Sequence, residues 1–377
     1  MPSRSASPII LGVETSCDET AAAVIGRDGR ILSSVLSSQH EVHARYGGVV
    51  PELAARRHLE TMEAVAAEAM KQGKMEWPDL DGVAVTCGPG LAGALLVGVS
   101  FGKAVAYARS IPLIAVNHLE GHMASAWLET PDFPTPCVIL IVSGGHTHLY
   151  LVEEPGCYHL IGRTLDDAAG EAFDKAAKML QLGFPGGPAI DRAASTGRVD
   201  AVRFPRPYSK NGTLDFSFSG LKTALLYHLK NLERGGQPRR VDDLAASFQE
   251  AIVDVLVEKA FEAVRRYRVS AVAVVGGVSA NSRLRTLLAM RAEASAVRLA
   301  IPCSGYCTDN AAMIASAGRQ AYLRGRFASW NLEADPSLAV PTESGLSNDT
   351  NPEMPRRSSQ RTKEGRRSRP SAETPTA

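Results

Sequence analysis

The chain of 377 residues repeats one order of secondary-structure signals, and this repetition constrains its fold most. The first copy predicts a strand over 8–16, a hairpin over 19–38 around the Asp28-Gly29 turn, and a helix over 52–71. It continues with a buried strand over 82–90 that ends in a glycine loop, a helix from residue 91 onward and a strand over 112–116. The second copy predicts three strands over 137–143, 147–153 and 158–163, and a helix over 168–181. A long helix over 242–268 follows, and then residues 271–281 predict a buried strand with a double glycine before a helix. We therefore predict two similar α/β domains, each with a mixed sheet, that meet at a cleft.

Two segments are expected to lack regular structure. Residues 182–220 are rich in Gly, Pro, Ser and Asn, which predicts a long functional loop region. Residues 335–377 lack aromatic side chains and apolar periodicity, which predicts a disordered tail. The longest apolar stretch, 91–108, is interrupted by Lys103 and three glycines, so it predicts a buried helix and not a membrane span.

Charge and cysteine content narrow the classes of function. The net charge is +1, and residues 347–377 hold seven of the 41 basic and four of the 40 acidic residues, so the remaining body is not basic. If the body binds nucleic acid, it must use a local patch, a small contact or a partner protein. No signal-peptide core is expected at the N-terminus, and six cysteines without a CxxC pair indicate a cytoplasmic protein with reduced thiols.

Several glycine-rich turns are candidates for phosphate binding, because glycine lets backbone N–H groups approach a ligand closely. They are Gly88-Pro89-Gly90, Ser143-Gly144-Gly145-His146, Gly186-Gly187 and Gly276-Gly277. Each alone is more typical of a simple turn, but several in a duplicated α/β frame favour a nucleotide in the cleft. None matches GxxxxGK[ST], so the chain is not a P-loop protein.

Polar side chains accompany these turns. Asp18 follows the first strand, Asp174 and Asp191 flank Gly186-Gly187, and Asn281 opens the helix after the last double glycine. Such groups can bind ribose hydroxyls or an adenine edge, although each alone is also typical of a helix cap or a surface charge. His146 can contact a ligand or make a hydrogen bond within the loop. His40, His43 and His58 are expected on the solvated surface.

A possible metal site begins at NHLEGH. His118 and His122 are four residues apart, so a helix would place both imidazoles on one face. Asp309, at the start of a C-terminal helix, is the best third ligand, and two imidazoles with one carboxylate suit Fe(II) or Zn(II). A structural role for the two histidines remains the alternative. Glu120 is one position too late for the HExxH pattern of zinc proteases.

Ten motifs in order resemble those of one known family, the universal tRNA adenosine threonylcarbamoyltransferases in their bacterial form. They cover residues from about 8 to 330 and read GVETSCDETAAAV, YGGVVPELAARRH, GPGLAGALLVG, NHLEGH, VSGGHTHLYLV, DDAAGEAFDKAAKML, GFPGGPAID, FSFSGLKTA, GGVSANSRLR and CTDNAAMIA. Gln181 and Phe184 depart from the pattern, since Gly and Tyr are commoner there. Older descriptions called the family glycoprotein endopeptidases, a function that the position of Glu120 disfavours.

The resemblance implies an actin-like, Hsp70/sugar-kinase-type fold of two ribonuclease H-like domains around a nucleotide cleft. We expect the first domain over 1–116, completed by a helix over 308–330, and the second over 117–307. The implied activity is transfer of a threonylcarbamoyl group from threonylcarbamoyl-AMP to N6 of adenosine 37, in tRNAs that read codons beginning with A. The implied partners are a paralogous protein of the same fold and a small P-loop ATPase, with no membrane.

The family pattern also implies site residues. The metal ligands fall on His118, His122 and Asp309, with Fe(II) preferred over Zn(II), and the substrate contacts fall on Val142, Ser143, Gly144, Gly145, His146, Asp174, Gly187, Asp191 and Asn281. Asp18 is our candidate for the base that accepts the amine proton. Two alternatives stay open: a zinc metalloprotease, and an actin-like ATPase or scaffold without transfer chemistry.

Overall fold

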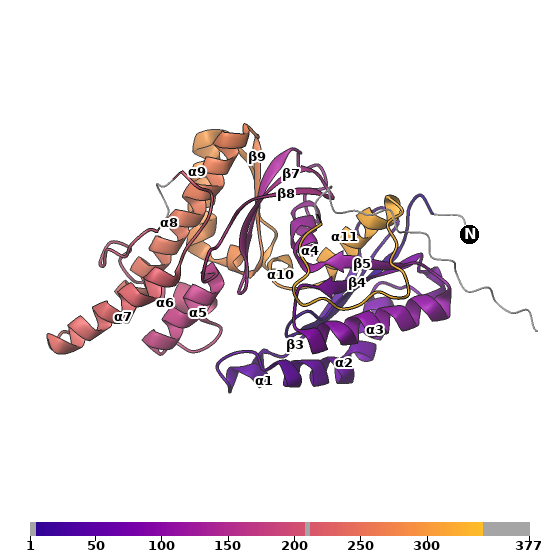
Figure 1. The fold of residues 1–377 in the computed structure, drawn as a ribbon, viewed down its shortest axis with the longest axis horizontal. Helices are drawn as coiled ribbons and strands as arrows, with labels where there is room; N and C mark the ends of the chain where they lie inside the picture. The colour runs from indigo at the N-terminus through magenta and orange to yellow at the C-terminus, as the bar shows by residue number, and fades with distance from the viewer. Residues whose placement is uncertain (1–4, 208–211, 342–377) are drawn as a thin grey trace, which may run out of the picture.

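The computed structural model describes residues 5–207 and 212–341, and within them it contains two five-stranded sheets of matching topology (Figure 1). The first sheet has the order β3-β2-β1-β4-β5, with bounds Ile31–Ser38, Glu19–Ile25, Ile10–Glu14, Gly82–Gly88 and Leu113–Asn117. The second has the order β8-β7-β6-β9-β10, with bounds Cys157–Arg163, Thr147–Glu154, Cys137–Val142, Ala271–Val275 and Arg298–Ala300. The predicted duplication is therefore confirmed, and β10 adds to the second sheet a fifth strand that was not predicted from the sequence.

Each sheet is mixed in the same way. The central strands β1 and β6 pair antiparallel with the meander on one side, to β2 and β7, and parallel with β4 and β9 on the other. β1, β4, β6 and β9 are buried along their whole length, which explains their continuous apolar sequences. The carboxyl ends of parallel neighbours meet at one edge of each sheet, and this edge is where ligands bind in open α/β sheets.

Helices cover both faces of the first sheet. Helices α2 (Pro51–Gln72) and α3 (Ala92–Arg109) pack on the face that carries Leu11 and Val13, and α11 (Ala311–Leu323) packs on the face that carries Ile10. Gly12 lets α11 approach closely, because a Cβ there would lie 2.5 Å from the Ala311 carbonyl oxygen. Helix α11, which comes late in the sequence, thus covers the second face of the first sheet, as Figure 1 shows.

Helices also cover the second sheet. The larger hydrophobic core joins one face of β6, β7 and β9 to α5, α6, α7, α8 and α9, with bounds Ala169–Leu180, Gly186–Ala194, Ser219–Arg234, Val241–Tyr267 and Ser282–Ser295. The opposite face packs on Leu119 and Met123 of α4 (His118–Ala124) and on the following turn η2 (Ser125–Trp127). Shorter elements are α1, α10, η1 and η3, with bounds His40–Ala44, Ser304–Cys307, Trp77–Asp79 and Gly277–Ala280. The domain boundaries given above remain a proposal.

Some predictions need correction. Residues 182–220 are not one loop, because α6 lies within them and α7 begins at Ser219. The C-terminal tail does not begin at 335: residues 335–341 lie along the first sheet, where the Asp335 amide donates to the Cys87 carbonyl at 2.8 Å. Residues 342–377 of the predicted tail lie outside the described residues. His43 and His58 are fully buried, contrary to the expectation of a solvated surface.

No helix among the described residues is long and apolar enough to cross a membrane, which agrees with the prediction for residues 91–108. In α3 that segment packs its small and branched side chains, among them Val97, Val99 and Ala106, into the core that α2 and α3 form with the first sheet.

Candidate metal centre and substrate loops

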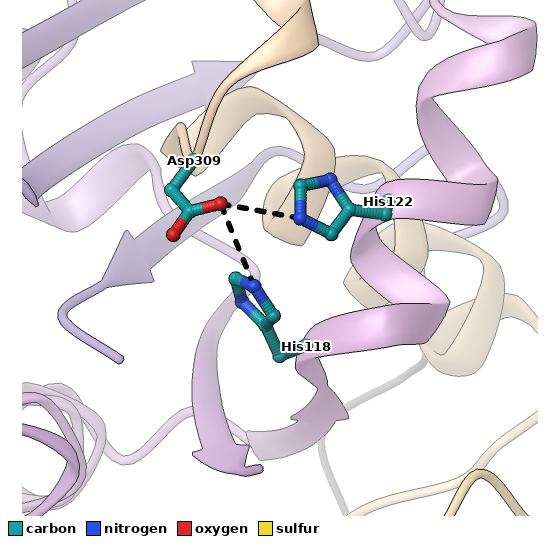
Figure 2. A group of neighbouring side chains, drawn as sticks. All are labelled: His118, His122 and Asp309. Carbon is teal, nitrogen blue, oxygen red and sulfur yellow. Dashed lines mark ion pairs between the residues drawn. The ribbon is translucent and has the colours of Figure 1, made fainter. Parts of the chain in front are cut away.

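The candidate metal centre lies at the carboxyl end of the first sheet's parallel strands. Strand β5 ends at Asn117, whose side chain caps α4 by accepting a hydrogen bond of 2.9 Å from the Leu119 amide. His118 and His122 follow on one face of that helix and are both buried. Asp309 comes from the turn before α11. One helix and a turn far apart in the sequence therefore supply the three side chains, and Figure 2 shows the side chains pointing toward one another.

The distances fit ligands of one metal ion. Asp309 Oδ1 lies 3.1 Å from His122 Nε2 and 3.5 Å from His118 Nε2, and the three ligand atoms all lie within 4.8 Å of one another. Ligand atoms about 2.1 Å from a common ion and roughly 90–110° apart would be separated by about 3.0–3.4 Å. Neither ring nitrogen of the buried His122 makes a hydrogen bond of good geometry, which would be costly without another partner. These residues form a possible binding group for a divalent metal.

Glu14 supports the site and was not recognised from the sequence. Its Oε2 accepts hydrogen bonds from Thr86 Oγ1 at 2.7 Å and lies 3.1 Å from His118 Nδ1. Such a carboxylate fixes the tautomer that leaves Nε2 facing the metal position. The available signal was a glutamate inside the apolar strand run PIILGVETS, since a buried charge requires a partner.

The electrostatics of the group reflect close, buried opposite charges. Burial lowers the pKa of His118, but the Asp309 and Glu14 carboxylates outweigh it and raise that pKa to about 9. Burial raises the pKa of Asp309, but His118 and His122 outweigh it and hold the pKa below its usual range. The pKa of Glu14 is likewise lowered, because His118 outweighs the effect of burial.

Two further carboxylates lie near the centre: Asp18 in the turn after β1, and Glu19 as the first residue of β2. Burial, Asp309 and Asp18 together raise the pKa of Glu19 to about 10. Asp18 is partly buried beside Glu19, and its backbone carbonyl accepts the Gln39 amide at 3.1 Å. Glu120, by contrast, lies in a pocket with Gly156, Arg324 and Arg326, away from the metal group.

The loop between β6 and β7 faces the same region. Gly144 and Gly145 are exposed, and the space beside both is open. The loop is held by its ends: the Ser143 amide donates to the His146 carbonyl at 2.8 Å, and Ser143 Oγ accepts the His146 amide at 3.1 Å. Burial, followed by the positive charge of His118, lowers the pKa of His146 to about 3, which places this imidazole in the field of the metal group.

The other predicted substrate residues gather around the start of α6 and α9. Asp174 Oδ1 accepts the Gly186 amide at 2.6 Å, while the space beside Gly187 is open. Asp191 accepts hydrogen bonds from the Ser282 hydroxyl at 2.7 Å and the Ser282 amide at 3.1 Å. Asn281 caps α9 by accepting the Leu284 amide and donates to Gln249 Oε1 at 2.7 Å. The last two side chains therefore fix the α9 N-terminus.

The turn Gly88-Pro89-Gly90 is not an open cradle, contrary to the sequence-based hypothesis. A Cβ at Gly88 would overlap the Asp335 carbonyl, and the Gly90 amide donates to the Pro336 carbonyl at 3.2 Å. The turn is covered by the C-terminal segment 335–338. Among the four glycine turns, open space remains beside Gly144, Gly145 and Gly187.

Comparison with solved structures confirms the actin-like fold. Component A of the (R)-2-hydroxyglutaryl-CoA dehydratase from Acidaminococcus fermentans aligns with a TM-score of 0.51 at 14% identity, over 84% of this chain and 99% of that chain. HypF from T. kodakarensis aligns with a TM-score of 0.56 at 14% identity, over 86% of this chain and 48% of that one. At such low identity these similarities show the fold alone.

Sequence comparison is more specific. The tRNA N6-adenosine threonylcarbamoyltransferase of Desulfitobacterium hafniense is 49% identical over 338 residues, which are 90% of this chain and 99% of that protein. The protein of that name from Anaeromyxobacter sp. is 53% identical, over 87% of this chain and 98% of its own. A family model described as tRNA N6-adenosine threonylcarbamoyltransferase matches residues 30–316. The chain therefore belongs to the tRNA N6-adenosine threonylcarbamoyltransferase family.

Proposed function

We propose that this chain transfers an L-threonylcarbamoyl group from threonylcarbamoyl-AMP to N6 of adenosine 37, in tRNAs that read codons beginning with A. Membership of the family makes the chain a transferase that modifies tRNA. One observation carries the structural part of the proposal: His118, His122 and Asp309 converge, and their charges act on His146 of the loop that contains the open Gly144-Gly145 turn.

In this proposal His118, His122 and Asp309 hold one divalent cation, with Fe(II) preferred and Zn(II) the alternative. Two imidazoles and a carboxylate suit either ion and leave positions open for substrate. When bound, such an ion supplies Lewis-acid polarisation of an oxygen atom of the substrate. Glu14 orients His118 for this role through its contact with Nδ1.

The second sheet would hold the nucleotide half of the donor. Backbone N–H groups of the Gly144-Gly145 turn can approach a phosphate, since both glycines are exposed and the space beside them is open. Gly187 offers a second open backbone position, and Asp174 positions it by accepting the amide of Gly186. We assign substrate contacts to residues on these elements: Val142, Ser143, Gly144, Gly145, His146, Asp174, Gly187, Asp191 and Asn281.

The reaction requires the enzyme to orient the two substrates and to stabilise the charge that develops on the leaving group, more than to activate the donor. The anhydride bond between the carbamoyl carbon and the phosphate is already reactive, but the adenine amine is a poor nucleophile because its lone pair is delocalised. The N6–carbonyl bond forms, the carbonyl–phosphate bond breaks, and AMP leaves with the bonding electrons. We assign Asp18 as the base that accepts the N6 proton, because it lies in the turn after β1 next to Glu19, whose pKa is raised by burial and by the charge of Asp309.

The charge of the chain suggests that it works with other proteins. Its body is not basic overall, so we propose that a paralogous protein of the same fold supplies part of the tRNA surface. A small P-loop ATPase would act with them, since this sequence has no P-loop of its own. We place the reaction in the cytoplasm, where tRNA is modified.

The test is transfer with defined components. The full chain, with its accessory proteins, is incubated with unmodified tRNA, threonine, bicarbonate and ATP, and the tRNA nucleosides are analysed by mass spectrometry. The expected product is threonylcarbamoyladenosine at position 37. Cleavage of a protein substrate in the absence of tRNA, with no modified nucleoside, would instead favour the metalloprotease. Nucleotide binding alone would favour the scaffold.

A further inference from the structure

A second group of potential metal ligands lies at the tip of the β7–β8 hairpin, and it shares no residue with the candidate metal centre. Glu153 is near the end of β7, and Cys157 and His159 are two residues apart on β8, so their side chains lie on one face. The ladder between the two strands is irregular between Val152 and Glu154, a feature that redirects side chains locally. Three different donor types therefore meet within one tight turn.

The three residues bring their donor atoms close together, with one ligand atom from each within 4.8 Å of the other two. Cys157 Sγ lies 3.7 Å from Glu153 Oε2 and 3.6 Å from His159 Nε2, and His159 Nε2 lies 3.4 Å from Glu153 Oε1. Ligands in a tetrahedral zinc site lie at about 2.3 Å for sulfur and about 2.0–2.2 Å for nitrogen and oxygen. Those bond lengths imply separations of about 3.6 Å from sulfur to nitrogen or oxygen and about 3.4 Å from nitrogen to oxygen. The sulfur-to-nitrogen distance therefore matches a tetrahedral site, and the two contacts of Glu153, which involve different carboxylate oxygens, show that its carboxylate lies within reach of the same ion.

The environment also suits a metal ion. Cys157 is 4% exposed, whereas the side chains of Glu153 and His159 are 58% and 42% exposed. The sulfur is therefore protected, while the other two ligands leave access for an entering ion and for a water at a fourth position. A thiolate with one imidazole and one carboxylate is a donor set that favours Zn(II) over Mg²⁺ or Ca²⁺.

We propose that Glu153, Cys157 and His159 form a second transition-metal site, which takes Zn(II) with a water as the fourth ligand. Metal binding converts the Cys157 thiol to a thiolate and releases its proton to solvent. The ion ties the two strands of the hairpin together next to the Pro155-Gly156 turn, whose Pro155 carbonyl accepts a hydrogen bond from Arg324 at the end of α11. The site thus stabilises the point where the second sheet contacts α11.

The test uses Co(II), which substitutes for Zn(II) and reports sulfur ligation through a thiolate-to-metal charge-transfer band in the near ultraviolet. The metal-free full chain is titrated with Co(II), and bound metal is counted after dialysis. We expect the band in the wild type. Cys157→Ser should lose the band and one equivalent of bound Co(II), and Zn(II) should displace Co(II) and abolish the band in the wild type.

Three further variants separate the two sites and guard against misfolding. His159→Ala alters a half-exposed side chain, so it should remain folded and lose most of the band. Cys303→Ser, which alters an exposed cysteine elsewhere, should keep the full band. His122→Ala should lose one equivalent of Co(II) but keep the band. A wild type without the band, or a Cys157→Ser or folded His159→Ala variant that retains it, would show that the three side chains form only a hydrogen-bonded cluster.

Discussion

The Nδ1 atom of His118 lies 3.1 Å from Oε2 of Glu14, and both side chains are buried where β1 meets α4. This contact sets which ring nitrogen faces Asp309. A neutral imidazole that donates from Nδ1 presents an unprotonated Nε2, the form that binds a metal. The orientation of His118, which follows β5 at the start of α4, thus depends on the Glu14 carboxylate in β1.

Replacement of Glu14 tests this relationship. Glu14→Gln keeps the shape of the side chain but removes the charge that orients His118. We expect metal affinity to fall by about 10–100-fold, with a parallel loss of transfer at limiting metal. Isothermal titration with Zn(II) measures the affinity, and the exposed Glu60→Gln on α2 serves as the matched control. Equal affinity for Glu14→Gln and wild type would exclude the orienting role.

Gly12 tests the close packing of β1 against α11. In Gly12→Ala the new methyl group would lie 2.5 Å from the Ala311 carbonyl oxygen and 2.6 Å from the Ala315 amide nitrogen, so α11 must move. We expect a loss of stability of about 1–3 kcal/mol, as in other overpacked cores, measured by urea unfolding. Because Asp309 lies just before α11, metal affinity should fall as well. Gly220→Ala in α7, where the added methyl group meets open space, is the control.

One departure from the family pattern, Gln181 at a position where Gly is commoner, falls at a residue with an unusual backbone conformation. It is the C-cap residue of α5 and has φ of 60°, in the left-handed region. A non-glycine residue in that region costs about 1–2 kcal/mol. Glycine avoids this cost but loses more conformational entropy on folding, so the net advantage of glycine is smaller. We expect Gln181→Gly to stabilise the protein by about 0.5–1 kcal/mol in thermal or urea unfolding. Destabilisation by this substitution would contradict the assignment of strain.

Asp166 should make stability depend on acid pH. Its carboxylate accepts hydrogen bonds from the amides of Phe218 and Ser219 and from the Ser217 and Ser219 hydroxyls at the start of α7. Burial raises the pKa of Asp166, but these hydrogen bonds outweigh it and lower the pKa below its usual value.

A lowered pKa contributes stability above the unfolded pKa of about 4, and this contribution is lost as pH falls through the folded value. Asp166→Ala should therefore cost about 1 kcal/mol at pH 7, as other cap substitutions do. The difference in unfolding free energy from wild type should shrink below about pH 4. A difference that stays constant from pH 7 to pH 3 would argue against this role.

The duplicated fold was predictable from the sequence because each copy keeps the same order of apolar strands and helices. The sequence did not reveal α6, because it begins with Gly186-Gly187-Pro188, a composition typical of loops. Glycine and proline are tolerated in a first helical turn, and Ile190 later in α6 stabilises the helix by packing in the larger hydrophobic core.

Backbone-mediated contacts also escaped prediction. Residues 335–341 have no apolar periodicity, yet Asn117 Nδ2 donates to the Leu338 and Ala339 carbonyls at 3.1 and 3.0 Å. These contacts hold the segment partly through its main chain, and only isolated side chains such as Leu338 and Val340 pack against the cores, so the sequence shows no periodic signal. The same limit applies to the glycine turns: sequence could not distinguish Gly88, which is covered by Asp335, from Gly144, which is open.

The three metal-ligand candidates were named from spacing and family resemblance, and the structure brings them together. Their supporting carboxylate was missed, because the sequence does not show which buried glutamate faces which imidazole. Strand β1, helix α4 and the turn before α11 are far apart in the sequence and had to be placed side by side before Glu14 acquired a role.

Metal and transfer measured together on His122→Ala test the central claim most directly. The variant and a control, His228→Ala on α7, are purified from metal-free medium, titrated with Fe(II) under anaerobic conditions and assayed for transfer from threonylcarbamoyl-AMP to tRNA. The account predicts that His122→Ala binds Fe(II) poorly and forms no threonylcarbamoyladenosine, while His228→Ala matches the wild type in both. Undiminished transfer by a folded, metal-free His122→Ala protein would contradict it.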